Sequence, residues 1–195
     1  MRACCWSPQS ISACLAANRS AFLWPGGGSP APGHCFSRSL YSDIERRGVA
    51  VIALSISTQA RCELRDITAE IRSLVARWAD ERQRRDGALL LFSPHTTCGL
   101  TINEGADPDV RRDMIGFFGR LVPQFPERFG APAFAHAEEN SDAHIKTSLF
   151  GPQLLLPVSD GRLCLGRWQA VYLCEADGPR RRTLWAQWLQ GEADE

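Results

Sequence analysis

The sequence predicts a single compact α+β domain in which a mixed or antiparallel sheet packs against two main helices. Three observations predict this class. Two segments with helical spacing of apolar residues lie between earlier strand-like segments, the last third of the chain alternates strand-like segments with short turns, and no segment repeats. The length of 195 residues and the mass of 21.6 kDa suit one hydrophobic core.

The first 47 residues differ in composition from the rest of the chain. They contain no acidic residue before Asp43, they hold four of the eight cysteines, and residues 25–33 are rich in Pro and Gly. We therefore divide the chain into an N-terminal extension, residues 1–47, and a folded domain, residues 48–192. The extension is expected to be disordered or to reflect a misassigned start, with an organellar transit peptide as the alternative.

The elements of the first half follow from their apolar patterns. Residues 49–56 are β-prone and alternate loosely, which predicts a strand. Asp66 stands at an N-cap position before apolar residues at helical spacing, which predicts a helix that continues through Arg85. Residues 88–93 form a continuous apolar run, which predicts a central strand buried on both faces.

The second half contains one more helix and then mainly strands. The helix begins at Asp107 and ends before Pro123, with apolar residues at helical spacing between them. Residues 125–148 are expected to form loops. Strands are expected at residues 153–158, 162–165, 170–175 and 183–189.

Composition argues against two classes of protein. The net charge is zero, from 22 basic and 22 acidic residues, so we expect no nucleic-acid partner. No apolar run approaches the roughly 18 to 20 residues that cross a bilayer, so we expect no membrane partner. The cysteines of the folded domain form no C-x-x-C pair. We therefore expect no disulfide framework. We expect a reducing, cytoplasmic location instead.

Three histidines give the strongest chemical signal of the folded domain. His95 follows the predicted central strand, and His136 and His144 flank a group of acidic residues. Neutral imidazoles bind divalent transition metals, and three of them with one open position suit a catalytic zinc site. The alternative is that each histidine forms only local hydrogen bonds.

Two further polar clusters have the chemistry to bind an anion. The first comprises Thr96, Thr97, Asn103 and Glu104. Its hydroxyl and amide groups can hold phosphate oxygens and its carboxylate can act as a base, with hydrogen bonding at a strand edge as the alternative. The second comprises Arg180, Arg181 and Arg182, whose guanidinium groups can clamp a phosphate. Strand alternation places Arg180 and Arg182 on one face and Arg181 on the other.

Taken together, these residues resemble the YjbQ-like family, also called the secondary thiamine-phosphate synthase family. The resemblance covers about residues 49–191 and leaves the extension without a counterpart. It rests on His95-Thr96-Thr97, Thr101-Ile102-Asn103-Glu104, Asp107-Pro108-Asp109-Val110, His136 through Asn140, Asp142-Ala143-His144, Leu165-Gly166-Arg167-Trp168-Gln169, and Asp177-Gly178-Pro179-Arg180 with Arg182. One departure is Arg167, which stands where a threonine is common.

The resemblance implies a YjbQ-like α+β fold, a homotrimer, and a pocket near the subunit interface where the three histidines meet. It implies a transferase of thiamine biosynthesis whose partners are small phosphorylated metabolites. The reaction joins hydroxymethylpyrimidine diphosphate to thiazole phosphate and gives thiamine phosphate and pyrophosphate, as a weak, secondary activity.

On this basis we expect the following site residues. Catalytic roles fall to His95, Glu104, His136 and His144, and substrate binding falls to Thr96, Thr97, Asn103, Asn140, Asp142, Trp168, Gln169, Arg180 and Arg182. His95, His136 and His144 would also hold a divalent metal, either zinc or magnesium. Two alternatives stay open: a metal-dependent hydrolase of a phosphate-containing metabolite, and a non-enzymatic trimeric protein that binds a small anion.

Overall fold

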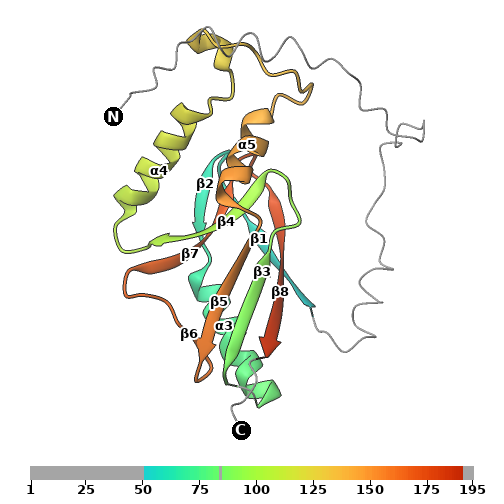
Figure 1. Cartoon of the computed structure of the whole chain (residues 1–195), viewed down its shortest axis with the longest axis vertical. Helices are drawn as coiled ribbons and strands as arrows, with labels where there is room; N and C mark the ends of the chain where they lie inside the picture. Colours follow the sequence, from blue (N-terminus) through green and yellow to red (C-terminus); the bar gives the residue numbers. More distant parts are fainter. Residues whose placement is uncertain (1–50, 84, 191–195) are drawn as a thin grey trace, which may run out of the picture. The chain divides into compact units, whose positions relative to one another are not determined.

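The computed structural model describes residues 51–83 and 85–190, and the extension expected over residues 1–47 lies outside them. The described residues form two antiparallel sheets (Figure 1). The larger sheet has the strand order β1-β8-β3-β5-β6, and the smaller has the order β2-β7-β4. The α+β class is confirmed, with two sheets in place of the single sheet expected.

The bounds of the elements are as follows. The strands are β1 (Val51–Ser57), β2 (Glu63–Asp66), β3 (Gly87–Phe92), β4 (Cys98–Glu104), β5 (Gln153–Ser159), β6 (Arg162–Leu163), β7 (Gln169–Glu175) and β8 (Arg181–Gln190). The helices are α3 (Thr68–Arg82), α4 (Pro108–Leu121) and α5 (Ser141–Phe150), with a short 3₁₀ turn η1 (Pro126–Phe129).

The main core lies between the two sheets and helix α3. Leu91 of β3, Leu100 of β4 and Ile71 of α3 are fully buried in it. Strand β3 is central, as expected, but it is not buried on both faces. Leu90 is only partly buried, and its cross-strand partner Leu155 is 62% exposed. The second face of the larger sheet therefore has no full cover within the described residues.

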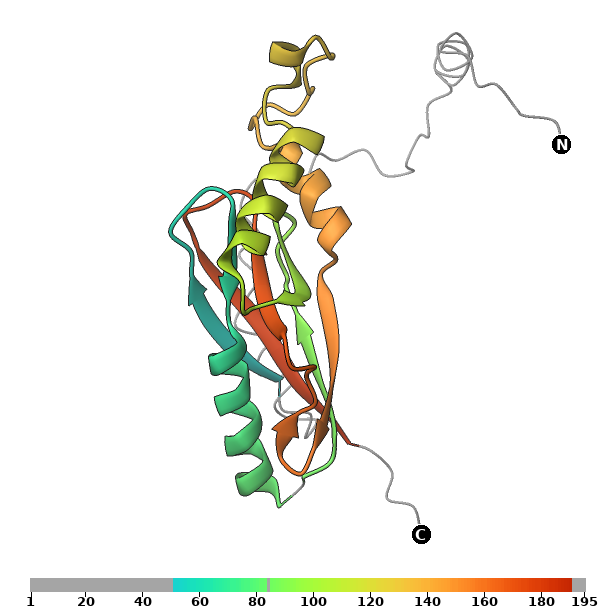
Figure 2. The same ribbon diagram turned by 90° about the vertical axis from the view of Figure 1, so that its left-hand side faces the viewer.

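Helix α3 and the smaller sheet share one face of the larger sheet (Figure 2). The helix begins one position later than its expected cap, because Ile67 occupies the N-cap. Asp66 still acts as the cap acceptor, since its Oδ1 accepts the N–H of Thr68 at 2.9 Å. The helix ends at Arg82 and not at Arg85, because Gln83 adopts a left-handed conformation with φ of 52°.

Helix α4 starts as the sequence predicts, at a cap in which the side chain of Asp107 accepts the N–H of Asp109. The helix borders β2 of the smaller sheet, yet none of its residues is buried among the described residues. Phe117 and Leu121 are 55% and 54% exposed. An amphipathic helix with an uncovered apolar face is unusual for an isolated domain.

Helix α5 corrects the expectation that residues 125–148 form loops. Its buried face carries the charged side chains of Asp142 and Lys146 beside Ala143. Helix prediction depends on apolar residues at helical spacing, and charges on the buried face remove that pattern. Gly99 of β4 permits the close approach of this helix, because a Cβ there would lie 2.8 Å from the carbonyl oxygen of Gly151.

None of the helices described is both long enough and apolar enough to cross a bilayer.

Candidate functional site

Three loops and the start of α5 meet at one end of the two sheets, which we call the polar end (Figure 1). The loops are residues 58–62, residues 93–97 and residues 176–180. Hydrogen bonds join them: the N–H of Thr58 donates to the carbonyl of Arg180, and the N–H of Ala176 donates to the carbonyl of Thr97. Segments that are distant in sequence therefore form one continuous polar region.

His95 lies where the hydrogen bonding between β3 and β8 ends. The last paired residues are Phe92 and Trp185, and beyond them the imidazole replaces a strand carbonyl as the acceptor. The N–H of Thr183 donates to His95 Nε2 at 2.9 Å. A neutral imidazole whose Nε2 accepts a hydrogen bond carries its proton on Nδ1. The backbone of β8 therefore selects the tautomer of His95 that has an Nδ1–H donor.

The electrostatic surroundings keep the His95 ring neutral. Burial lowers the pKa of His95 below the ordinary 6.5, and the positive charge of Arg182 lowers it further. The positive charge of Arg180 also lowers it, while the negative charge of Glu175 raises it. At neutral pH the side chain is thus a hydrogen-bond donor without a positive charge.

Arg182 and Glu175 form a buried ion pair next to His95. Arg182 Nε donates to Glu175 Oε2 at 2.7 Å, and its Nη2 donates both to Glu175 Oε1 and to Thr97 Oγ1. Thr58 Oγ1 donates a further hydrogen bond to Glu175. Burial acts to raise the pKa of Glu175, but the hydrogen bonds from Arg182 outweigh it and hold the pKa below 4.5. Arg182, expected to bind substrate, is occupied inside the protein.

Arg180 is the more accessible guanidinium of the polar end, with a side chain that is 53% exposed. It binds the turn before it, donating from Nε to the carbonyl of Asp177 at 2.6 Å and from Nη2 to the Asp177 carboxylate at 2.7 Å. The same carboxylate accepts a hydrogen bond from Asn140 Nδ2 at 3.2 Å. Asp177 thus connects Arg180 to the start of α5.

Asp142 anchors the first turn of α5 to the loop between β1 and β2. Arg61 binds it with both terminal nitrogens, at 2.9 and 3.0 Å, and Lys146 Nζ lies 2.7 Å from Oδ2. Burial acts to raise the pKa of Asp142, but hydrogen bonds from Arg61 and Lys146 hold it below 3.8. Asp142 was expected to bind substrate, but its side chain is fully buried and positions the helix instead.

His136 and His144 lie together at the start of α5. Their ring centroids are 5.6 Å apart with planes at 81°, and both rings line an open hollow of about 430 Å³. His136 Nε2 is 3.8 Å from the carboxylate of Glu138. Asn140 lies between the two histidines in sequence and is buried, and its Oδ1 has no hydrogen-bond partner among the described residues.

The described residues of one chain do not fit the expected three-histidine metal site. Within residues 51–83 and 85–190, no group of three or more His, Cys, Asp or Glu side chains is arranged to hold a metal ion. His95 Nε2 already accepts the Thr183 N–H, and its Nδ1 carries the proton. Neither nitrogen of His95 therefore offers a free lone pair to a metal ion. His136 and His144 remain as two possible ligands without a third histidine.

The other expected site residues lie at the far end of β4 and β7. The pairing register places Cys98 opposite Glu175 and Glu104 opposite Gln169. Six steps along β4 separate the two ends by about 20 Å. Glu104 therefore does not act as a base beside His95 of the same chain. The residues found at this far end are Asn103, Glu104, Trp168 and Gln169.

Several residues that shape the polar end received no role from the sequence. They are Thr58, Arg61, Lys146, Glu175 and Asp177. The sequence did contain a signal for Glu175. It is a single carboxylate at the end of an apolar strand, and a buried carboxylate needs a buried partner. Thr58 and Arg61 gave no such signal, because their partners lie more than 80 residues away.

Comparisons with known proteins agree with the resemblance found in the sequence. A family model described as "UPF0047 protein YjbQ-like" matches residues 52–191. The UPF0047 protein MJ1081 of Methanocaldococcus jannaschii is 43% identical over 132 residues, which cover 68% of this chain and 88% of that protein. The UPF0047 protein YugU of Bacillus subtilis is 42% identical over 136 residues, which cover 70% of this chain and 96% of that protein.

Solved structures show the same fold. A YjbQ/UPF0047 family protein of Clostridium acetobutylicum matches with a TM-score of 0.63 and 38% identity, covering 71% of this chain and 99% of that chain. The conserved hypothetical protein TT1486 of Thermus thermophilus matches with a TM-score of 0.62 and 40% identity, over 71% of this chain and 99% of that chain. The chain therefore belongs to the UPF0047 family of YjbQ-like proteins.

Proposed function

We propose that the chain is a transferase of the thiamine-phosphate synthase type and that its reaction takes place at the polar end. Its substrates would be hydroxymethylpyrimidine diphosphate and thiazole phosphate. The observation that carries this proposal is a neutral His95 with an Nδ1–H donor in the electrostatic field of Arg180 and Arg182. Donors and cations in one place suit a phosphorylated substrate.

The reaction needs little from the protein beyond stabilisation of a leaving group. The bond between the pyrimidine methylene carbon and the diphosphate oxygen breaks, and its electron pair leaves with the diphosphate. The lone pair of the thiazole nitrogen forms the new carbon–nitrogen bond. Because negative charge grows on the diphosphate, preorganised donors at that group lower the barrier.

Arg180 and His95 are the donors that we assign to the diphosphate. Arg180 is half exposed and bound only to the adjacent turn, so the diphosphate can compete with Asp177 for its guanidinium. His95 would donate from Nδ1 without the cost of burying a charge. Arg182 and Glu175 would act as positioning residues, because their hydrogen-bonding groups are committed to each other and to Thr97.

We further propose a homotrimer in the cytoplasm. The uncovered apolar side chains of Phe117 and Leu121 on α4 support association, since a surface of this kind is normally covered by another chain. The described cysteines support a reducing compartment, because Cys62, Cys98, Cys164 and Cys174 are all free thiols.

The test is formation of thiamine phosphate by the purified full chain from both substrates. Arg180→Gln is expected to lower kcat by about a hundredfold, the usual effect of removing one donor from a developing anion. Arg181→Gln is the matched control, because this neighbouring side chain is exposed and its Nε donates to Ser55 Oγ. The control is expected to keep the activity of the unaltered chain.

Four outcomes would contradict the proposal. They are absence of product with the unaltered chain, equal losses in both variants, diphosphate release without any thiazole phosphate, and tight binding with no turnover. The third outcome would indicate the hydrolase, and the fourth the anion-binding protein.

A further inference from the structure

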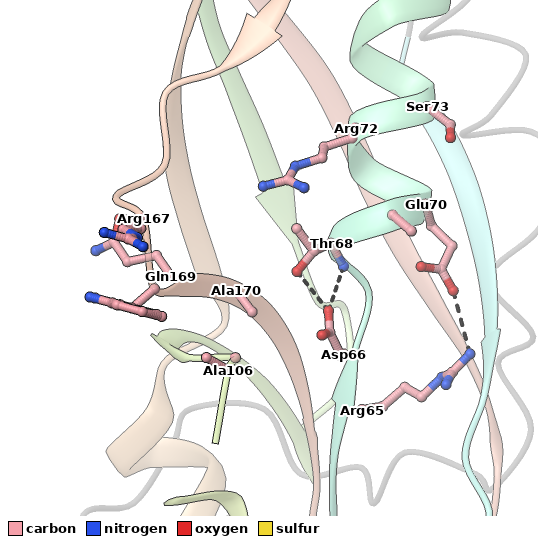
Figure 3. A pocket seen from close by; sticks show the side chains of 13 residues that line it. Arg65, Asp66, Thr68, Glu70, Arg72, Ser73, Ala106, Arg167, Gln169 and Ala170 are labelled. Carbon is pink, nitrogen blue, oxygen red and sulfur yellow. Dashed lines mark hydrogen bonds and ion pairs between the residues drawn. The ribbon is translucent and has the colours of Figure 1, made fainter. Parts of the chain in front are cut away.

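A second hollow, larger than the one beside His144, lies between the first turns of α3 and the turn that precedes β7 (Figure 3). Its volume is about 1110 Å³. This is near the upper limit of roughly 300–1,000 Å³ for pockets that bind small molecules. It lies at the Gln169 end of β7, and six steps along the strand at about 3.3 Å each place that end about 20 Å from Glu175. It is therefore separate from the polar end.

The walls of this hollow are held in place by hydrogen bonds. The N–H of Gly105 donates to the carbonyl of Trp168 at 2.8 Å, which fixes the turn before β7 against the end of β4. On the opposite wall, Thr68 Oγ1 accepts the N–H of Val171 at 2.9 Å and ties α3 to β7. A Cβ on Gly105 would lie 2.6 Å from the Cβ of Ala170, so the two segments meet closely at this point. Both walls of the hollow are thus fixed to the smaller sheet.

The hollow has an excess of positive charge. Its carboxylates are engaged: Asp66 accepts two hydrogen bonds from Thr68, and Glu70 pairs with Arg65 at 3.4 Å. The remaining arginines, Arg72 and Arg167, have no ion-pair partner among the residues that the structure describes. Figure 3 shows the guanidinium of Arg72 extending from α3 toward the turn that carries Arg167. Three arginines and two carboxylates line the hollow, so its net charge is +1, and Arg72 and Arg167 line it without an ion-pair partner among the described residues.

An aromatic surface adjoins these charges. Trp168 is 56% exposed, and the guanidinium of Arg167 lies over one face of its ring, 4.7 Å from the centroid. Stacking of a planar ring on an exposed indole stabilises a complex without the need for matched hydrogen bonds.

We propose that this hollow binds a heteroaromatic monophosphate. The planar ring stacks on Trp168, and the phosphate is held by Arg72 and Arg167 from opposite walls. Arginine suits this role, since its planar group of donors matches two phosphate oxygens. The inference does not depend on the reaction proposed at the polar end.

The test is binding of AMP to the full chain by titration calorimetry, with adenosine and inorganic phosphate as separate probes at equal ionic strength. AMP is expected to bind at least about tenfold more tightly than either part alone. Arg72→Gln and Trp168→Ala are each expected to weaken AMP binding by about tenfold or more, the usual effect of losing a charge-assisted hydrogen bond or a stacking partner. AMP binding that is weakened by Arg180→Gln and not by Arg72→Gln would place AMP at the polar end and would overturn the proposal.

Arg77→Gln is the matched control, because Arg77 lies on the same helix, is exposed and pairs with Glu81. This variant is expected to bind AMP as the unaltered chain does. Binding of adenosine as tightly as AMP, equal losses in the Arg72 and Arg77 variants, or no AMP binding at millimolar concentration would each overturn the proposal.

Discussion

The two ends of the β4 and β7 pair use arginine in different ways. At the polar end Arg182 is buried, and its guanidinium donates to Glu175 and Thr97. At the far end Arg72 and Arg167 line an open hollow with no carboxylate paired to them in the described part of the chain. A buried arginine bound to a carboxylate is held inside the fold, and an arginine without an ion-pair partner beside a hollow is available to a ligand. The arginines at the two ends thus differ: Arg182 of β8 is held inside the fold, whereas Arg72 of α3 and Arg167 before β7 are the residues that we propose to bind a ligand.

The largest effect that we predict is a loss of unfolding free energy when the buried pair of Arg182 and Glu175 is broken. Glu175→Gln leaves the charge of Arg182 buried without its counter-ion, which typically costs about 3–5 kcal/mol of unfolding free energy. Chemical denaturation measures this loss. Glu81→Gln removes the exposed partner of Arg77 and is expected to cost no more than about 1 kcal/mol. Similar losses in the two variants would show that the buried pair has no special structural role.

A smaller effect is expected from the pH dependence of stability. The folded-state pKa of His95 lies below 6.5, so folding favours its neutral form. That contribution is complete above pH 6.5 and is lost as the pH falls below this value. Glu175 and Asp142 also have lowered pKa values, and their contributions are lost only at more acidic pH, below 4.5 and 3.8 respectively.

Chemical denaturation measured at pH 7 and at pH 5.5 separates the contribution of His95 to stability from those of Glu175 and Asp142. The unaltered chain is expected to lose more unfolding free energy between the two values than His95→Gln, which has no titrating ring. Identical losses would mean that the His95 ring is no more buried than in an unfolded chain.

Local patterns in the sequence predicted much of the fold. The cap at Asp107 and the apolar run that became β3 depend on neighbouring residues and lie where they were expected, whereas the N-cap of α3 is Ile67, one position after Asp66. Helix α5 was missed for a physical reason: its buried face holds the ion pair of Asp142 and Lys146, and apolar periodicity cannot detect a buried charge pair.

The candidate site was predicted less completely, because it depends on strand order. His95 receives its hydrogen bond from Thr183, which is 88 residues away in sequence. The residue types singled out His95, Arg180 and Arg182, which the structure brings to the polar end. They did not indicate that Glu104 lies at the opposite end of β4, since no strand was expected over Cys98–Glu104.

The central claim is that the backbone of β8 fixes His95 as a neutral ring protonated on Nδ1. Nitrogen-15 NMR of the histidine rings at pH 7 tests it most directly. The account predicts that His95 shows a protonated Nδ1 and an unprotonated Nε2, which is hydrogen-bonded to the Thr183 amide. A proton on Nε2, or a doubly protonated ring at this pH, would contradict it.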